Sequence, residues 1–134
     1  MARAARILVV DDNDTLRTLI AQALEFEGYV AIAASSGEEA MEVARFSPPD
    51  LCLVDHVMPG MNGAELIRAL RSSDDERLRG VPSIGLSAYE TARHELIAAG
   101  AVGAVGKPVT YGVLLALVRA TLGDEGASAE PTAG

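Results

Sequence analysis

The chain has 134 residues, 49% of them hydrophobic, and a formal net charge of −8. This length suits one compact domain with a core that needs no staples, and the negative charge argues against nucleic acid or an anionic membrane as the main partner. Cys52 is the only cysteine, which excludes an internal disulfide and fits a reducing, cytoplasmic setting. The apolar run that opens the chain stops at "DDND", so we expect neither a signal peptide nor a membrane span.

Short apolar runs alternate along the chain with segments of helical periodicity. The runs predicted to be strands are "RILVV" (6–10), "YVAIAA" (29–34), "LCLV" (51–54), "PSIGLS" (82–87) and "GAVGAVG" (100–106). Strands that are apolar throughout, without alternation, are typical of a parallel sheet covered by helices on both faces. The pattern predicts an α/β fold, a (βα)5 doubly wound sheet.

Helical segments carry their own start and stop signals. An apolar stripe over 16–24 predicts the first helix, and Gly28 marks its end. The pairs at 36–39 and 62–65, Ser or Asn followed three residues later by Glu, have the spacing of capping boxes, and a second stripe follows at 66–70. Each of these segments lies between two predicted strands.

The last residues differ in composition from the rest. After Leu122 the sequence "GDEGASAEPTAG" is rich in Gly, Ala and acid and has no periodicity. We therefore predict one domain over 1–122 and a disordered tail or linker stump over 123–134.

The stretch "AAGAVGAVGKPVT" (98–110) has regularly spaced glycines before a lysine. A phosphate-binding P-loop needs G-x-x-x-x-G-K-[ST], but Ala101 replaces the first glycine and Pro108 replaces the hydroxyl residue. The dinucleotide pattern G-x-G-x-x-G also fails, because the glycines are three apart. Lys107 therefore needs another explanation.

Polar residues gather where the predicted strands end. These residues are Asp11, Asp12, Asp55, Ser87 and Lys107. In doubly wound sheets ligands bind beyond the carboxyl ends of the strands, so we expect the five side chains to meet at one edge. Three carboxylates repel unless they share a proton or a hard divalent cation, and Mg²⁺ with a phosphate as a further ligand suits such a set. The pattern indicates a site for a phosphoryl group.

Simpler interpretations exist for several of these residues. Asp11, Asn13 or Asp14 alone would be an ordinary helix cap. Ser87 lies three residues before Glu90, so it fits a capping box that could coexist with a phosphate contact.

Other interpretations concern the lysine and the histidines. Lys107 alone would be a solvated lysine, and Pro108 would start a helix or follow a cis bond. His56 lies beside Asp55, but no second histidine or cysteine stands at ligand spacing and His94 falls within a helical stretch, which disfavours zinc.

Four stretches carry a resemblance to a known family. "ILVVDDNDTLRTLI", "PPDLCLVDHVMPGMNG", "GLSAY" and "GKPV" stand in the order and spacing of the receiver domain of two-component response regulators. The most specific part is Pro49 to Gly63, where an aspartate at a strand end precedes Met-Pro-Gly-Met-Asn-Gly. The chain resembles this family from residue 6 to about residue 122.

The resemblance implies a fold and a chemistry. The fold is the flavodoxin-like sheet of order 2-1-3-4-5. Asp55 matches the phospho-acceptor, Ser87 the hydroxyl residue that moves toward the phosphoryl group, and Lys107 the lysine that pairs with it. The metal ligands would be Asp11, Asp12, Asp55 and the backbone carbonyl of Val57, holding Mg²⁺. The implied partner is a histidine kinase or histidine phosphotransfer protein, with a homodimer possible and an effector unknown.

Departures from the family pattern keep alternatives open. Ala104 replaces the aromatic residue that usually reports phosphorylation, and Tyr89 is either a substitute for it or a solvent-facing residue. The favoured interpretation is a phosphorylated signalling domain, not an enzyme in the ordinary sense. The alternatives are a relay receiver cut from a hybrid kinase, a docking module without phosphorylation, and an aspartyl phosphohydrolase. The last would need a second aspartate where Val57 stands.

Overall fold

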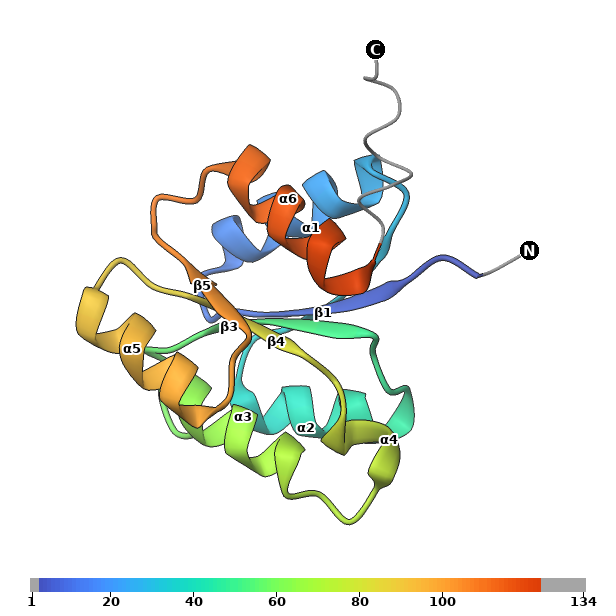
Figure 1. Ribbon diagram of the computed structural model, residues 1–134, viewed down its shortest axis with the longest axis vertical. Coiled ribbons are helices and arrows are strands. Elements are labelled where there is room, and N and C mark those ends of the chain that lie inside the picture. Colours follow the sequence, from blue (N-terminus) through green and yellow to red (C-terminus); the bar gives the residue numbers. More distant parts are fainter. Residues whose placement is uncertain (1–2, 124–134) are drawn as a thin grey trace.

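A computed structural model describes residues 3–123 as a sheet between two layers of helices (Figure 1). The strands are β1 (Arg6–Val10), β2 (Val30–Ala34), β3 (Leu51–Asp55), β4 (Ser83–Leu86) and β5 (Gly103–Val105). The helices are α1 (Asp14–Phe26), α2 (Gly37–Phe46), α3 (Gly63–Arg71), α4 (Glu76–Arg79), α5 (Glu90–Ala99) and α6 (Tyr111–Leu122). The five strands are parallel in the order β2-β1-β3-β4-β5, which confirms the predicted fold.

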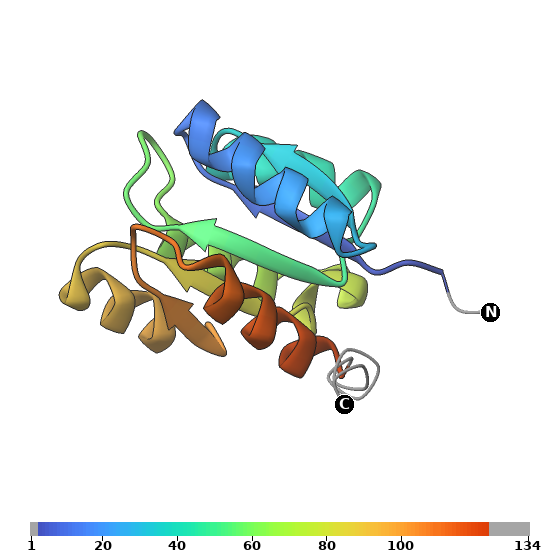
Figure 2. The ribbon, with the colours of Figure 1, turned by 90° about the horizontal axis from the view of Figure 1, so that it is seen from above.

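Each face of the sheet has its own apolar core. α1 and α6 cover one face, where Ile7, Leu53 and Ile84 meet apolar residues of both helices. Figure 2 looks onto this face. α2, α3 and α5 cover the other face, where Leu8 and Val54 are buried. Burial on both sides explains why the strands are apolar throughout.

The predicted start and stop signals mostly hold. Asn13 caps α1 by accepting the Leu16 amide, and the Asn62–Glu65 pair forms a complete capping box at α3. Ser36 accepts the amide of Glu39 as predicted, but the Glu39 carboxylate bonds Ser35 instead of returning to the cap residue. Gly28 follows the end of α1 with a φ of 96°.

Two expected helix starts are wrong. The Ser87–Glu90 capping box does not form, because Tyr89 is the cap residue of α5 and the Ser87 hydroxyl accepts the Tyr89 amide. Pro108 does not start α6, which begins at Tyr111, while the alternative given for this residue, a cis Lys107–Pro108 peptide bond, is confirmed.

The one-turn helix α4 has no counterpart among the predicted elements. Asp75 caps it by accepting the amide of Arg77, and Leu78 is buried beneath it. A search of the described residues finds no helix long and apolar enough to cross a membrane. The predicted tail falls almost wholly outside the described residues, so the boundary after Leu122 stays a prediction.

Candidate functional site

Three carboxylates meet at the carboxyl edge of the sheet. Asp11 and Asp12 follow β1, and Asp55 is the last residue of β3. One carboxylate oxygen from each lies within 4.8 Å of the others. Asp11 is fully buried, Asp55 is buried and Asp12 is exposed. Because β1 and β3 are neighbours in register, strand pairing itself holds the three groups together. The predicted acidic cluster is thus present, and its oxygens are the donors that a hard cation prefers.

Lys107 joins this cluster from the far edge of the sheet. It follows β5, and its Nζ donates to Asp11 Oδ2 at 3.0 Å and to Asp55 Oδ1 at 3.0 Å. The lysine side chain is 22% exposed, so both bonds are partly shielded from water. Lys107 is therefore no ordinary solvated lysine, since it supplies the positive charge that two buried carboxylates need.

The site perturbs the proton affinities of its own groups. Burial raises the pKa of Asp55, and the charges of Asp11 and Asp12 add to this effect while Lys107 opposes it. Burial on its own would lower the pKa of Lys107, but the hydrogen bonds and charges of Asp55 and Asp11 outweigh it and raise that pKa. Ionised Asp55 is thus held at a cost in free energy that a cation would offset.

The start of α1 fixes the backbone that carries Asp11. Asp11 Oδ1 accepts the Asn13 amide at 2.9 Å, and Asn13 caps the helix. Arg17, one turn further on, donates to the Asp11 carbonyl at 2.8 Å and to Asp14. The helix cap and the acidic site are therefore one structure, so the two interpretations of "DDND" do not compete. Sequence spacing gave no sign of the Arg17–Asp11 contact.

The loop after Asp55 closes tightly on α3. The amide of Gly63 donates to the His56 carbonyl at 2.9 Å. A Cβ at Gly63 would lie 2.3 Å from the Asp55 carbonyl oxygen and 2.9 Å from His56 Cα. Only glycine fits at this close approach. The "MPGMNG" segment thus brings the first turn of α3 against the backbone of Asp55.

Ser87 follows β4, as predicted, and is buried. Its amide donates to the Val105 carbonyl of β5, its hydroxyl accepts the Tyr89 amide at 3.2 Å, and its carbonyl accepts from Arg93 at 2.9 Å. No hydrogen bond joins its side chain to Asp55 among the described residues. Ser87 therefore lies at the strand edge that carries the site and is held by its own loop.

The remaining predicted positions lie near the site with different exposures. The Val57 side chain is 64% exposed and Tyr89 is 66% exposed. The role of the Val57 carbonyl as a metal ligand stays a prediction. Ala104 lies in β5, half-buried, opposite Gly85 of β4. The exposure of Tyr89 agrees with the solvent-facing interpretation of this residue.

His56 is a structural histidine in the described structure. It is 7% exposed, its Nδ1 accepts the Ala64 amide at 3.3 Å, and its Nε2 lies 2.7 Å from Glu95 Oε1. Both ring nitrogens are therefore engaged within the protein. His56 is not among the grouped metal-ligating side chains of the described residues.

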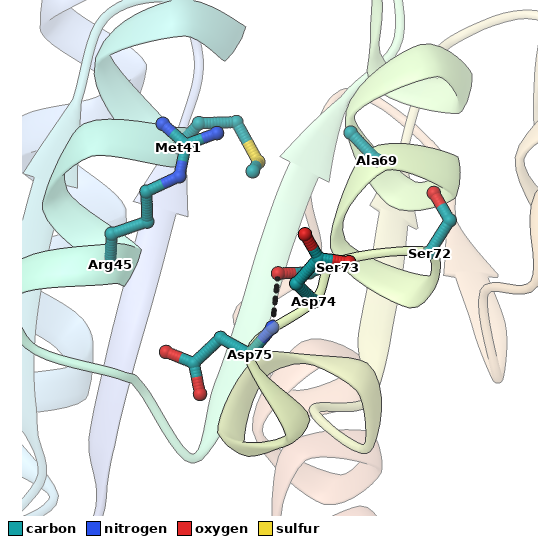
Figure 3. A pocket seen from close by; sticks show the side chains of 7 residues that line it. All are labelled: Met41, Arg45, Ala69, Ser72, Ser73, Asp74 and Asp75. Carbon is teal, nitrogen blue, oxygen red and sulfur yellow. Dashed lines mark hydrogen bonds between the residues drawn. The ribbon is translucent and has the colours of Figure 1, made fainter.

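A separate pocket of about 520 Å³ lies away from the acidic site (Figure 3). It is lined by Met41, Arg45, Ala69, Ser72, Ser73, Asp74 and Asp75. These residues come from α2, the end of α3 and the loop before α4, at the edge where the strands begin. None of the carboxylates at the strand ends lines this pocket.

Comparisons with known proteins agree with this site. Residues 7–119 match the response regulator receiver domain family. Response regulator MprA of Mycobacterium ulcerans is 36% identical over 121 residues, which cover 89% of this chain and 50% of that protein. Polar-differentiation response regulator DivK of Brucella ovis is 32% identical over 120 residues, covering 88% of this chain and 96% of that protein. The chain thus spans about half the length of the MprA protein.

Solved structures share the fold. Chemotaxis protein CheY4 of Vibrio cholerae superimposes with a TM-score of 0.81 at 29% identity, covering 89% of this chain and 99% of that chain. The chain therefore belongs to the receiver domain family of two-component signalling, a family of phospho-accepting signalling domains and not of classical enzymes.

Proposed function

We propose that this receiver domain takes a phosphoryl group onto Asp55 and signals by a change of conformation. The observation that carries the proposal is the arrangement of Asp55, a buried carboxylate at a strand end with Lys107 on one oxygen and two more carboxylates within 4.8 Å. Such a site concentrates the charges that phosphoryl transfer needs, where catalysis is mostly positioning and neutralisation.

The proposed transfer starts from a phosphohistidine. Lys107 binds Oδ1 of Asp55, so Oδ2 is the oxygen that attacks the phosphorus. The new O–P bond forms as the P–N bond breaks, and the leaving imidazole nitrogen keeps the electron pair and takes up a proton. Ser87 and Lys107 then bind the phosphoryl oxygens, Ser87 by donating its hydroxyl hydrogen and Lys107 by its charge.

The acidic cluster fits a divalent cation. Three carboxylates with one lysine leave a net negative charge at the site, and their oxygens suit a hard ion. We propose that Asp11, Asp12, Asp55 and the Val57 carbonyl hold Mg²⁺, directly or through water. When bound, Mg²⁺ would neutralise charge on the phosphoryl oxygens.

The proposed partners follow from the chemistry of the site. The donor would be a histidine kinase or a histidine phosphotransfer protein, and the setting would be cytoplasmic. The output would pass through contacts with another protein. Neither nucleic acid nor membrane is proposed as a partner, in keeping with the net charge of −8.

The test is phosphate incorporation from a small acyl phosphate, followed by intact mass. The wild-type protein should gain one phosphoryl group in Mg²⁺ and lose this ability in excess chelator. Asp55→Asn should gain none while its fold stays intact, because the amide is nearly isosteric but is not a nucleophile. Labelling of Asp55→Asn at the wild-type level would show that another residue accepts the group.

A further inference from the structure

α5 is tied to the candidate site by two of its own side chains. Glu95 contacts His56, which directly follows Asp55, and Arg93 contacts the backbone of Ser87. The two bonds reach the ends of β3 and β4, the strands that carry Asp55 and Ser87.

The donor and the acceptor can be assigned in the hydrogen bond between His56 and Glu95, the contact on the β3 side. His56 Nδ1 accepts the Ala64 amide, so in the neutral ring the hydrogen is on Nε2 and is donated to Glu95 Oε1. The buried imidazole thus connects the residue after Asp55 with the first turn of α3 and with α5. A movement of the His56 peptide would therefore displace both the first turn of α3 and α5.

The contact on the β4 side involves the residue proposed to respond to phosphate. Arg93 NH1 donates to the Ser87 carbonyl at 2.9 Å. The same nitrogen would lie 3.6 Å from a Cβ built at Gly106, the residue before Lys107. The guanidinium therefore lies between the ends of β4 and β5, beside Ser87 and beside the residue that precedes Lys107.

The body of α5 is pinned over the sheet. A Cβ at Gly85 would lie only 2.6 Å from Leu96 Cδ1, so Leu96 sits directly on the β4 backbone. Ala104, the residue paired with Gly85, has no side chain long enough to turn between two positions. The usual aromatic reporter is therefore missing from β5, while two polar contacts join α5 to the site.

We propose that Arg93 and Glu95 are positioning residues that couple α5 to the phosphorylation state of Asp55, in place of an aromatic side chain on β5. The inference rests on the proposed function. When the Ser87 hydroxyl turns from the Tyr89 amide toward a phosphoryl group, the Ser87 peptide shifts and Arg93 follows its carbonyl. The His56 peptide, directly after Asp55, shifts at the same time, and the hydrogen bond from His56 to Glu95 transmits this shift to α5.

The experiment uses backbone amide NMR of the whole chain with Mg²⁺ and beryllofluoride, an analogue of the bound phosphoryl group. In wild type, amides beside Asp55 and amides of α5 should both shift. Arg93→Met keeps the aliphatic stem but removes the donor, and Glu95→Leu removes the acceptor. Both variants should keep the shifts beside Asp55 while the α5 shifts fall about twofold or more, the size of change expected when one coupling contact is lost.

Conservative variants and a control separate coupling from simple packing. Arg93→Lys and Glu95→Gln keep a donor or an acceptor and should restore much of the α5 response. His94→Gln lies on the same turn with its side chain 72% exposed and should leave the response unchanged. Full α5 shifts in both Arg93→Met and Glu95→Leu would overturn the coupling role alone. Absence of any shift beside Asp55 in wild type would instead overturn the proposed phospho-acceptance, and this inference with it.

Discussion

The ion pair between Lys107 and Asp11 shows how one lysine lowers the free-energy cost of a buried carboxylate at this site. Asp11 is fully buried and accepts the Lys107 ammonium and the Asn13 amide. The charge of a buried carboxylate is tolerated only when it is paired and hydrogen-bonded. Lys107 therefore stabilises the fold in addition to the phosphate-binding role proposed for it, and the glycine-rich stretch around it does not encode these contacts.

Replacing this lysine should make the fold depend on magnesium. Lys107→Met leaves Asp11 and Asp55 without their cation, so we expect a loss of about 3 kcal/mol in the free energy of unfolding without metal. Mg²⁺ at about 100 times the dissociation constant of this variant should return about 2.7 kcal/mol, and the same Mg²⁺ concentration should return less in wild type, where Lys107 already neutralises part of the cluster and weakens cation binding. Urea unfolding with Mg²⁺ and with chelator measures both effects.

Arg119→Met provides the matched control. Arg119 pairs with Glu27 at a partly exposed position between α6 and the end of α1, far along the chain from the acidic residues. Its loss should cost about 1 kcal/mol or less, and added Mg²⁺ should stabilise this variant no more than it stabilises wild type. Equal Mg²⁺ effects on the Lys107 and Arg119 variants would mean that Lys107 does not balance the acidic cluster.

Two further residues should set the lifetime of the phosphorylated state. Water must attack the phosphorus in line, and we expect Val57 and Tyr89, two residues after Asp55 and two after Ser87 and both largely exposed, to lie between solvent and this atom. Valine cannot hydrogen-bond a water, and the tyrosine ring excludes it by bulk. We therefore expect slow self-dephosphorylation. Phosphate loss timed at one Mg²⁺ concentration should be faster in Val57→Asn and in Tyr89→Glu, and unchanged rates would exclude shielding by these side chains.

At the scale of elements, the position of α3 depends on one glycine. A Cβ at Gly63 would meet the backbone of Asp55 and His56, and backbone atoms cannot move aside as a flexible side chain can. Gly63→Ala should lower the free energy of unfolding by about 2 kcal/mol or more, because α3 must withdraw from the end of β3. Phosphate incorporation should fall with it, since the backbone of Asp55 is displaced.

Gly112→Ala tests whether this effect belongs to the position. Gly112 lies in the first turn of α6, and a Cβ there would meet nothing within 4 Å. This variant should raise stability by about 0.5–1 kcal/mol, because alanine loses less backbone freedom in a helix. Denaturant unfolding of both variants measures the two changes in the free energy of unfolding. Gly63→Ala must in addition reduce phosphate labelling, and normal labelling of this variant would contradict the predicted displacement of Asp55.

At the scale of the whole molecule, the acidic cluster is part of a formal net charge of −8. The raised pKa of Asp55 means that the folded protein binds a proton there more tightly than the unfolded chain does. The cost of ionised Asp55 is therefore present above the folded pKa and disappears as the pH falls toward the unfolded pKa, near 3.9.

The sign of this effect gives a pH prediction. Without metal at pH 7, Asp55→Asn should be more stable than wild type, and the difference should shrink as the pH is lowered to about 4. Glu42→Gln removes the same formal charge at an exposed position of α2 and should show a much smaller difference. Chemical unfolding across this pH range measures the stability difference between Asp55→Asn and wild type. A difference that grows on acidification would contradict the raised pKa of Asp55.

The sequence by itself determined the architecture and the residue types at the strand ends. Five apolar runs separated by helical periodicity are enough to specify a covered parallel sheet, because hydrophobic pattern and burial are directly linked. All five strands and the caps at Asn13 and Asn62 follow from local signals. The carboxylates and Lys107 could be placed at one edge because parallel strands end together.

Tertiary structure alone decided which groups contact one another. The bond from Lys107 to Asp11 spans 96 positions, and the bond from His56 to Glu95 spans 39, so no local spacing encodes either. The same holds for Ser87, whose spacing to Glu90 suggested a cap while the loop bonds its hydroxyl to the Tyr89 amide. Local signals compete on nearly equal terms at element ends, and packing between distant segments selects among them.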